Sequence, residues 1–267
     1  MKFSYLVYEP VFDLAELTAR MERVAELGYE GIELTATYPM GYPIEDLAAT
    51  AERIGLPVVS LMSGWSYAHE GCCLSSPDVA VRDRAVTRLI DYVGFAARLG
   101  SLVAVGLMQG HRTDEPDPAT ANRRIAEALG RVARVAEDRG VPIVVEPVNH
   151  LQVGFNHTAA EVADLVARIG SPAIGLMLDT IHMNIEERSM LDTVRDYGRQ
   201  ARHFHLAETN GSLYGTGNLD FGSVLTALDA VGYEEYVSIK IYRNPSWEEA
   251  ARSAMAFLRG VSGEGPG

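Results

Sequence analysis

Residues 138–147 read DRGVPIVVEP, and this stretch contains the unit from which the chain is built. A helical pattern ends at Gly140, a run of apolar and β-branched residues follows, and Glu146 interrupts that run near its end. A glycine after a helix readily adopts the left-handed conformation that closes it. The stretch therefore predicts a helix followed at once by a buried strand.

The same succession recurs along the chain, with apolar residues at helical spacing between the strand-like runs. These runs cover residues 2–8, 30–35, 57–62, 102–108, 142–147, 174–179, 203–208 and 236–242. Eight strand–helix units in 267 residues predict an α/β fold, a single (β/α)8 TIM barrel. A doubly wound open sheet is the alternative, but it would be expected to carry a glycine-rich phosphate-binding turn, and the sequence has none.

Length and composition narrow the class of protein. We expect one barrel domain over residues 1–259 and a flexible C-terminal tail over 260–267, GVSGEGPG. The net charge of −13 disfavours nucleic acid as a partner. No apolar run reaches the length of about 18 residues that a membrane span needs, and the first residues do not resemble a secretory signal. Cys72 and Cys73 are the only cysteines, so no disulfide framework is expected and a cytoplasmic location is predicted.

Ionisable side chains interrupt the apolar runs near their ends, where a barrel of this kind has its active site. They are Glu33, His111, Glu146, Asp179, His205 and Lys240. Burying two carboxylates together is costly unless a cation neutralises them, and two carboxylates with an imidazole suit Mn²⁺, Zn²⁺, Co²⁺ or Fe²⁺. A network of purely structural pairs is the alternative.

Four motifs resemble those of the xylose isomerase-like TIM barrels, in particular sugar phosphate isomerases and epimerases such as the ketose 3-epimerases. The motifs are VVEPVNH (144–150), LDTIHMNIEE (178–187), HFHLAETN (203–210) and GTGNLDF (215–221). The resemblance implies a divalent metal, Mn²⁺ first and Co²⁺, Zn²⁺, Fe²⁺ or Mg²⁺ otherwise. It assigns the metal to Glu146, Asp179 and His205 with a fourth carboxylate on the last strand, and it places His182 against the substrate.

The sequence departs from this family pattern at three positions. Lys240 stands where the last-strand glutamate is expected, Gln152 where the epimerases often have a second glutamate, and Gly211 where they often have an arginine. In the family the latter two usually hold the upper hydroxyls of the substrate. Their replacement weakens the expectation of the familiar ketose substrates.

Lys240 belongs to the run YVSIKIY (236–242), whose alternation places its side chain inside the barrel. Three alternatives follow. In the first, its ammonium pairs with Glu146 or Asp179 and replaces the metal. In the second, the metal stays on three ligands, and Lys240, with a lowered pKa, exchanges a proton opposite Glu146. In the third, Lys240 turns away and pairs with a carboxylate at the rim. We favour the second, because a catalytic metal commonly keeps three protein ligands and an open position.

Further residues are expected near the substrate. Trp65 is a candidate aromatic cover, with ordinary packing as the alternative. Glu33, His111, Gln152 and His182 are candidate polar contacts. A buried salt bridge is the alternative for Glu33, and a ligand of a second metal site is the alternative for His182. His203 lies one layer deeper than His205 and is expected to be structural.

The predicted activity is metal-dependent isomerisation or epimerisation of a keto-sugar or keto-polyol. Glu146 and Lys240 transfer protons next to the carbonyl, and the metal stabilises the enediolate. A lyase or dehydratase and a metal-free binding protein are the alternatives. A three-zinc DNA-repair barrel is disfavoured, because it needs a late Asp-x-His pair and a last-strand glutamate. The expected partner is a small carbohydrate, with neither nucleic acid nor membrane, and the protein is a candidate homo-oligomer.

Overall fold

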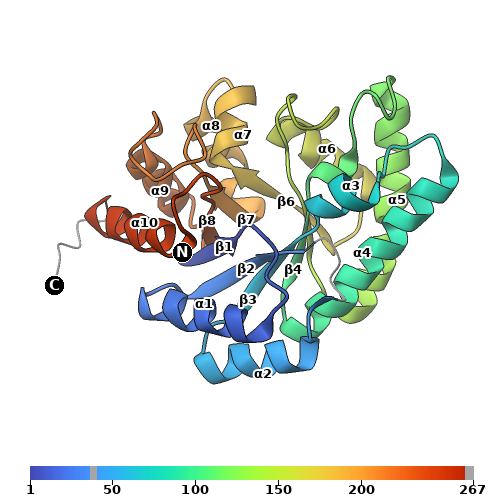
Figure 1. Cartoon of the computed structure of the whole chain (residues 1–267). Helices are drawn as coiled ribbons and strands as arrows, with labels where there is room; N and C mark the ends of the chain where they lie inside the picture. The colour runs from blue at the N-terminus through green and yellow to red at the C-terminus, as the bar shows by residue number, and fades with distance from the viewer. Residues whose placement is uncertain (37–40, 262–267) are drawn as a thin grey trace.

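The computed structural model describes residues 1–36 and 41–261 and forms a closed barrel of parallel strands, β1 to β8 in chain order (Figure 1). The strands are Lys2–Val7, Gly31–Thr35, Val58–Met62, Leu102–Val105, Ile143–Val145, Ile174–Asp179, Ala201–Leu206 and Tyr236–Ile239. Each strand pairs with the next, and β8 pairs with β1 to close the barrel. The predicted (β/α)8 barrel is therefore confirmed.

Helices surround the barrel (Figure 1). The α-helices are α1 (Leu14–Glu26), α2 (Ile44–Ile54), α3 (Gly64–Glu70), α4 (Val79–Leu99), α5 (Pro118–Arg139), α6 (Ala159–Ile169), α7 (Thr180–Glu186), α8 (Met190–Tyr197), α9 (Phe221–Ala230) and α10 (Trp247–Val261). Two short 3₁₀ turns are η2 (Leu107–Gln109) and η3 (Gly198–Gln200). As the sequence predicted, α2, α4, α5 and α6 each end at a glycine with left-handed backbone.

Several strands end earlier than the sequence pattern indicates. The run 102–108 forms a strand only to Val105, the run 142–147 only to Val145, and the run 236–242 only to Ile239. The backbone path nevertheless continues for one more residue, since the N–H groups of Glu146 and Lys240 donate to carbonyls of the neighbouring strands at 2.9 Å. The polar residues therefore lie where the strands open into loops.

The barrel interior is divided along its axis. Ala104, Val144 and Met177 form a small apolar cluster that is separate from the main core between strands and helices. Other parts of the interior are polar, and one example is the pair of hydroxyls on Ser4 and Ser238, whose oxygens lie 2.6 Å apart. Buried polar groups require partners, so this polar interior is where charged side chains can be held in place.

The C-terminal tail and the question of a membrane span can be compared with what the sequence predicted. Gly260 and Val261 belong to α10, and the rest of the predicted tail, 262–267, lies outside the described residues. Among the helices of the described residues, none combines the length and the apolar character needed to cross a membrane.

Candidate active site

A cavity opens at the C-terminal ends of the strands. Its empty volume is about 710 Å³, including space open to solvent, which is in the range of small-molecule sites. Predicted site residues that line it are Trp65, Glu146, Gln152, His182 and Lys240. These five residues come from separate parts of the chain, and the fold brings them around one cavity.

The other predicted residues lie around this cavity in different ways. Asp179 and His205 are fully buried. Asp179 contacts the cavity-lining Lys240 and His205 contacts the cavity-lining Glu146, so the two residues form the cavity floor. Glu33 is also fully buried, but it lies one layer further down against His205. His111 lies to the side, with its ring 5.5 Å from that of Tyr67. Among the described residues, neither Glu33 nor His111 lines the cavity.

Two carboxylates and one imidazole converge on the cavity floor. Nδ1 of His205 lies 3.3 Å from Oδ2 of Asp179 and 3.5 Å from Oε1 of Glu146. Burial alone would raise the pKa of both carboxyls, but Lys240 and the nearby imidazoles outweigh it. They hold the pKa of Glu146 below its usual range and that of Asp179 well below it. Both groups are therefore carboxylates at neutral pH.

The donor atoms on this floor fit a divalent cation. Bonds of about 2.1 Å at tetrahedral angles place ligand atoms about 3.4 Å apart, close to the observed separations around His205. Oε1 of Glu146 and Nδ1 of His205 are buried, and neither has a hydrogen-bond partner among the described residues. Buried polar atoms without partners are costly, and a cation between them would satisfy both.

Lys240 brings a positive charge to the same place. Its Nζ donates to Oδ2 of Asp179 at 2.6 Å and lies 3.5 Å from Oε1 of Glu146. Burial would lower the pKa of this amine, but the two carboxylates outweigh burial and raise it above its ordinary value. Lys240 is thus an ammonium in this structure. The alternative in which it turns away to the rim is wrong, because the carboxylates attract it inward.

His182 follows Asp179 on α7 and reaches back over the carboxylates. Its Nε2 lies 3.6 Å from Oε1 of Glu146 and 3.9 Å from Oδ2 of Asp179. Burial lowers the pKa of this imidazole, even though the carboxylates act to raise it, so it is neutral at physiological pH. By distance alone, Glu146, Asp179 and His182 also form a candidate set of metal ligands.

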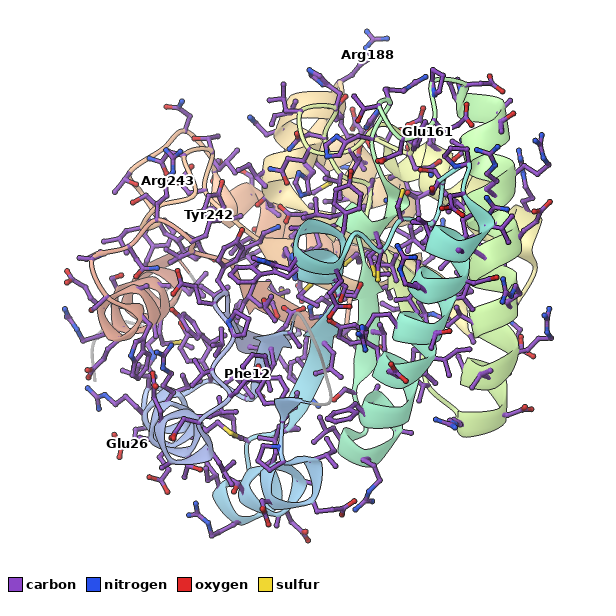
Figure 2. The ribbon with its side chains drawn as sticks, turned by 45° about the vertical axis from the view of Figure 1, so that its right-hand side comes forward. Phe12, Glu26, Glu161, Arg188, Tyr242 and Arg243 are labelled. Carbon is purple, nitrogen blue, oxygen red and sulfur yellow. The ribbon has the colours of Figure 1, made fainter. Side chains whose placement is uncertain are left out.

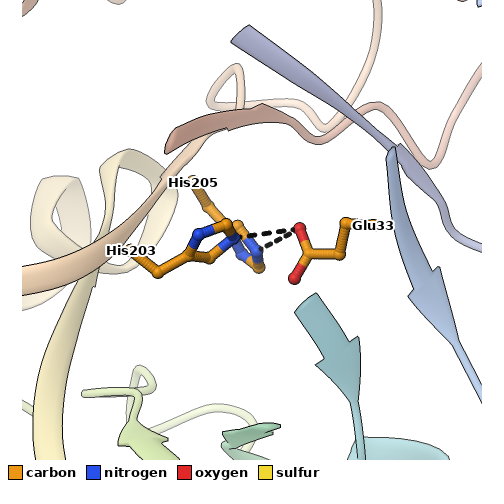
Figure 3. Close-up of side chains that lie close together, drawn as sticks. All are labelled: Glu33, His203 and His205. Carbon is orange, nitrogen blue, oxygen red and sulfur yellow. Dashed lines mark hydrogen bonds and ion pairs between the residues drawn. The ribbon is translucent and has the colours of Figure 1, made fainter. Parts of the chain in front are cut away.

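A second charged cluster lies beneath the first. Figure 3 shows the rings of His203 and His205, both from β7, pointing at one carboxylate oxygen of Glu33 from β2, at 3.2 and 3.0 Å. Burial acts to raise the pKa of Glu33 and to lower that of His205. The opposite charges outweigh burial, so the pKa of Glu33 lies well below its usual range and that of His205 well above it. Glu33, predicted as a substrate contact, is here the partner of two histidines.

Aromatic side chains form one wall of the cavity. The ring of Tyr8 lies 6.2 Å from Trp65 and 5.4 Å from Tyr242, which sits on the loop after β8 beside Arg243 (Figure 2). Tyr242 is not among the predicted site residues, although strand alternation places it on the same face as Lys240. Its ring packs on Gly211, where a side chain would collide with it. An aromatic ring thus fills the space next to the position where the family resemblance expects arginine.

The fold is that of a known class of barrels. A profile of the xylose isomerase-like TIM barrel family matches residues 21–261, and the chain belongs to this family. The resemblance seen in the sequence motifs is therefore confirmed.

Several relatives of this chain are sugar epimerases. An L-ribulose 3-epimerase from Mesorhizobium japonicum is 29% identical, with 92% of this chain and 82% of the relative covered. A solved structure of L-ribulose 3-epimerase superposes with a TM-score of 0.88 at 28% identity, covering 97% of this chain and 94% of the other. D-psicose 3-epimerase from Clostridium cellulolyticum H10, solved with D-tagatose, gives a TM-score of 0.85 at 27% identity, with 98% and 99% covered.

Proposed function

We propose that this protein is a sugar epimerase or isomerase that transfers a proton next to the carbonyl of a small keto-sugar or keto-polyol. The observation that carries the proposal is the contact between the Glu146 carboxylate and the Lys240 ammonium, 3.5 Å apart in the cavity. A base and an acid at the same place are what proton abstraction next to a carbonyl requires. The ketose 3-epimerases among the relatives support the substrate class.

Glu146 is the proposed base. It is ionised, it lines the cavity, and its Oε1 has no hydrogen-bond partner among the described residues, so a lone pair is available to take a proton. The electrons of the broken C–H bond move onto the carbonyl oxygen of the substrate. Glu146 then carries the proton that the substrate has lost.

Lys240 is the proposed acid. Its ammonium is held by Asp179 at 2.6 Å, which fixes the positive charge close to where negative charge develops on the substrate. Epimerisation requires the proton to return from the face opposite Glu146, so the substrate must enter between Lys240 and Glu146 and separate their 3.5 Å contact. This role differs from the favoured expectation of a neutral lysine, because the carboxylates around Lys240 stabilise its charged form.

Glu146, Asp179 and His205 are the proposed ligands of a divalent cation, with Mn²⁺ as the first candidate. When bound, such a cation stabilises negative charge on a substrate oxygen. Lys240 adds positive charge to this floor and occupies Asp179, so we expect weaker metal binding than with a carboxylate at position 240. Elemental analysis of the purified protein, with and without Mn²⁺ incubation, measures the occupancy directly.

The function is tested by solvent exchange, which does not require the product to be known. The protein is incubated in D₂O with a panel of ketoses and keto-polyols, with Mn²⁺ or with a chelator, and each sugar is analysed by NMR and mass spectrometry. We expect deuterium at the carbon next to the carbonyl with wild-type protein and none with Glu146→Gln. The matching polyols, which lack the carbonyl, are the substrate control. No exchange with any member of the panel, with or without Mn²⁺, would overturn the proposal.

A lyase or dehydratase is the second candidate, and the Lys240 ammonium favours it. Elimination starts with the same proton abstraction, and an acid in the cavity can protonate a departing hydroxyl. The same mass spectra distinguish the two reactions, because elimination of water lowers the mass of the sugar whereas epimerisation does not. Assembly as a homo-oligomer, the cytoplasmic location and the absence of nucleic-acid and membrane partners stay predictions from the sequence.

A further inference from the structure

The imidazole of His182 is contacted by two N–H groups of one residue. Nδ2 of the Asn149 side chain lies 2.8 Å from Nδ1 of His182, and the backbone N–H of Asn149 points at the same ring nitrogen at 3.5 Å. A ring nitrogen that faces two donors has to present its lone pair to them. Nδ1 of His182 is therefore the acceptor.

The orientation of the Asn149 amide is fixed by its own turn. Its Oδ1 accepts the backbone N–H of Leu151 at 3.1 Å. Turning the amide over would place its NH₂ group against that N–H and remove the hydrogen bond. The hydrogen bonds on both sides of the amide therefore fix the orientation in which Nδ2 faces His182.

With its lone pair on Nδ1, a neutral His182 carries its proton on Nε2. Nε2 lies 3.6 Å from Oε1 of Glu146, and His182 lines the cavity. The ring therefore presents an N–H donor toward the place where a substrate oxygen would lie. A nitrogen that carries a proton has no lone pair for a metal, so this geometry separates His182 from the candidate ligand set in which distance alone would include it.

His205 is held from the opposite end. Its Nε2 faces a carboxylate oxygen of Glu33 at 3.0 Å, and a carboxylate only accepts hydrogen bonds. Nε2 of His205 therefore carries a proton in either charge state, and Nδ1 is the atom that faces Asp179 and Glu146. One histidine is oriented by a donor and the other by an acceptor.

We infer that Asn149 is a positioning residue that keeps the proton of His182 on Nε2 and so makes His182 a hydrogen-bond donor to an oxygen of the substrate. The identity of that oxygen, a carbonyl or a hydroxyl of a keto-sugar, rests on the proposed function. The tautomer itself depends only on the contacts of Asn149. Asn149 does not line the cavity among the described residues, and it acts through the ring it holds.

The test replaces the donor by an acceptor of the same shape. In Asn149→Asp the carboxylate still accepts the N–H of Leu151 but now demands a proton on Nδ1 of His182. Long-range ¹H–¹⁵N NMR spectra of the imidazoles show which ring nitrogens carry protons. We expect Nδ1 of His182 to be unprotonated in the wild type and protonated in Asn149→Asp. Turnover is expected to fall about 100-fold, the usual effect of losing one preorganised donor, with a smaller change in KM.

Asn210→Asp is the matched control. Asn210 forms the same turn, with Oδ1 accepting the N–H of Ser212 at 2.9 Å, but its Nδ2 donates to Thr216 rather than to a histidine. The control should leave both the spectrum of His182 and turnover unchanged. A proton on Nδ1 of His182 in the wild type would overturn the inference, and so would an unprotonated Nδ1 in Asn149→Asp. The spectra require no substrate, so they separate failure of this inference from failure of the proposed function.

Discussion

The barrel holds two layers of buried charge that use similar residues for different ends. The upper layer, Glu146, Asp179 and Lys240, meets the cavity, and one of its carboxylate oxygens has no hydrogen-bond partner among the described residues. In the lower layer, one oxygen of Glu33 receives both His203 and His205, and these three side chains are sealed from solvent. Burial and shifted pKa values occur in both layers. Oε1 of Glu33 also has no hydrogen-bond partner among the described residues. Access from the cavity therefore distinguishes the chemical site from the structural one.

His205 joins the two layers. Its Nε2 is bound to Glu33 below, and its Nδ1 faces the carboxylates above. Side chains that hold a ligand from behind often affect a metal site almost as much as the ligands themselves. The lower layer can thus influence the upper one without touching the substrate.

The largest expected effect on turnover comes from replacing Glu146, the proton acceptor of the upper layer. Glu146→Gln keeps the shape of the side chain but removes the proton acceptor, so turnover should fall by about 1,000-fold, within the range for general bases. The free energy of unfolding should also fall, because Glu146→Gln removes the buried carboxylate that faces Lys240 at 3.5 Å. Deuterium exchange and urea unfolding measure the two quantities. An exchange rate within tenfold of the wild type would contradict the assignment of Glu146.

Lys240→Met removes the positively charged side chain from the same layer. Turnover should fall about 100-fold, since one charged stabiliser is lost. The buried carboxylates of Asp179 and Glu146 lose their compensating charge, so a divalent cation should become a more important source of stability. The increase in Tm produced by Mn²⁺ is accordingly expected to be larger in Lys240→Met than in wild type. An equal or smaller increase would mean that Lys240 does not compete for this floor.

Glu33→Gln addresses the lower layer and should act on stability first. Removing one partner of a buried charged pair costs about 3 kcal/mol in the free energy of unfolding. Because the pKa of Glu33 is lowered in the fold, its contribution is present above its unfolded value of about 4.3 and is lost as the pH falls through the folded pKa. The raised pKa of His205 acts in the opposite sense, so its contribution is lost as the pH rises through the folded value.

The measurement is the free energy of unfolding as a function of pH for the wild type and Glu33→Gln. The wild type should lose more stability than the variant on acidification below about pH 4, where an unfolded glutamate takes up its proton. Parallel curves in that range would show that Glu33 is not ionised in the fold, and the two layers would then differ in charge as well as in access.

The sequence predicted the architecture well because its signals are local. A glycine such as Gly140 ends a helix where the next strand begins, and the side chains of a strand alternate whatever the strand pairs with. The same alternation placed Glu146, Asp179 and Lys240 at one end of the barrel. The ends of the strands were less accurate, because loops that carry polar residues leave the ladder before the apolar pattern stops.

The contacts in the site that the sequence did not predict join segments that are distant along the chain. Glu33 and His203 are 170 residues apart and meet only because the barrel closes, which no local pattern encodes. Asn149 and His182 are 33 residues apart and meet where the loop after β5 faces α7. The sequence identifies these residue types, but only the fold determines which partner each of them finds.

The packing of Tyr242 on Gly211 limits how this cavity can evolve. Gly211 has left-handed backbone, with φ at 68°, and a side chain there would run into the ring of Tyr242, whose N–H donates to the Gly211 carbonyl at 3.1 Å. An arginine at position 211 is therefore excluded as long as the tyrosine remains. The two positions are therefore coupled: a substitution that adds a side chain at position 211 also requires the ring of Tyr242 to move or to be replaced.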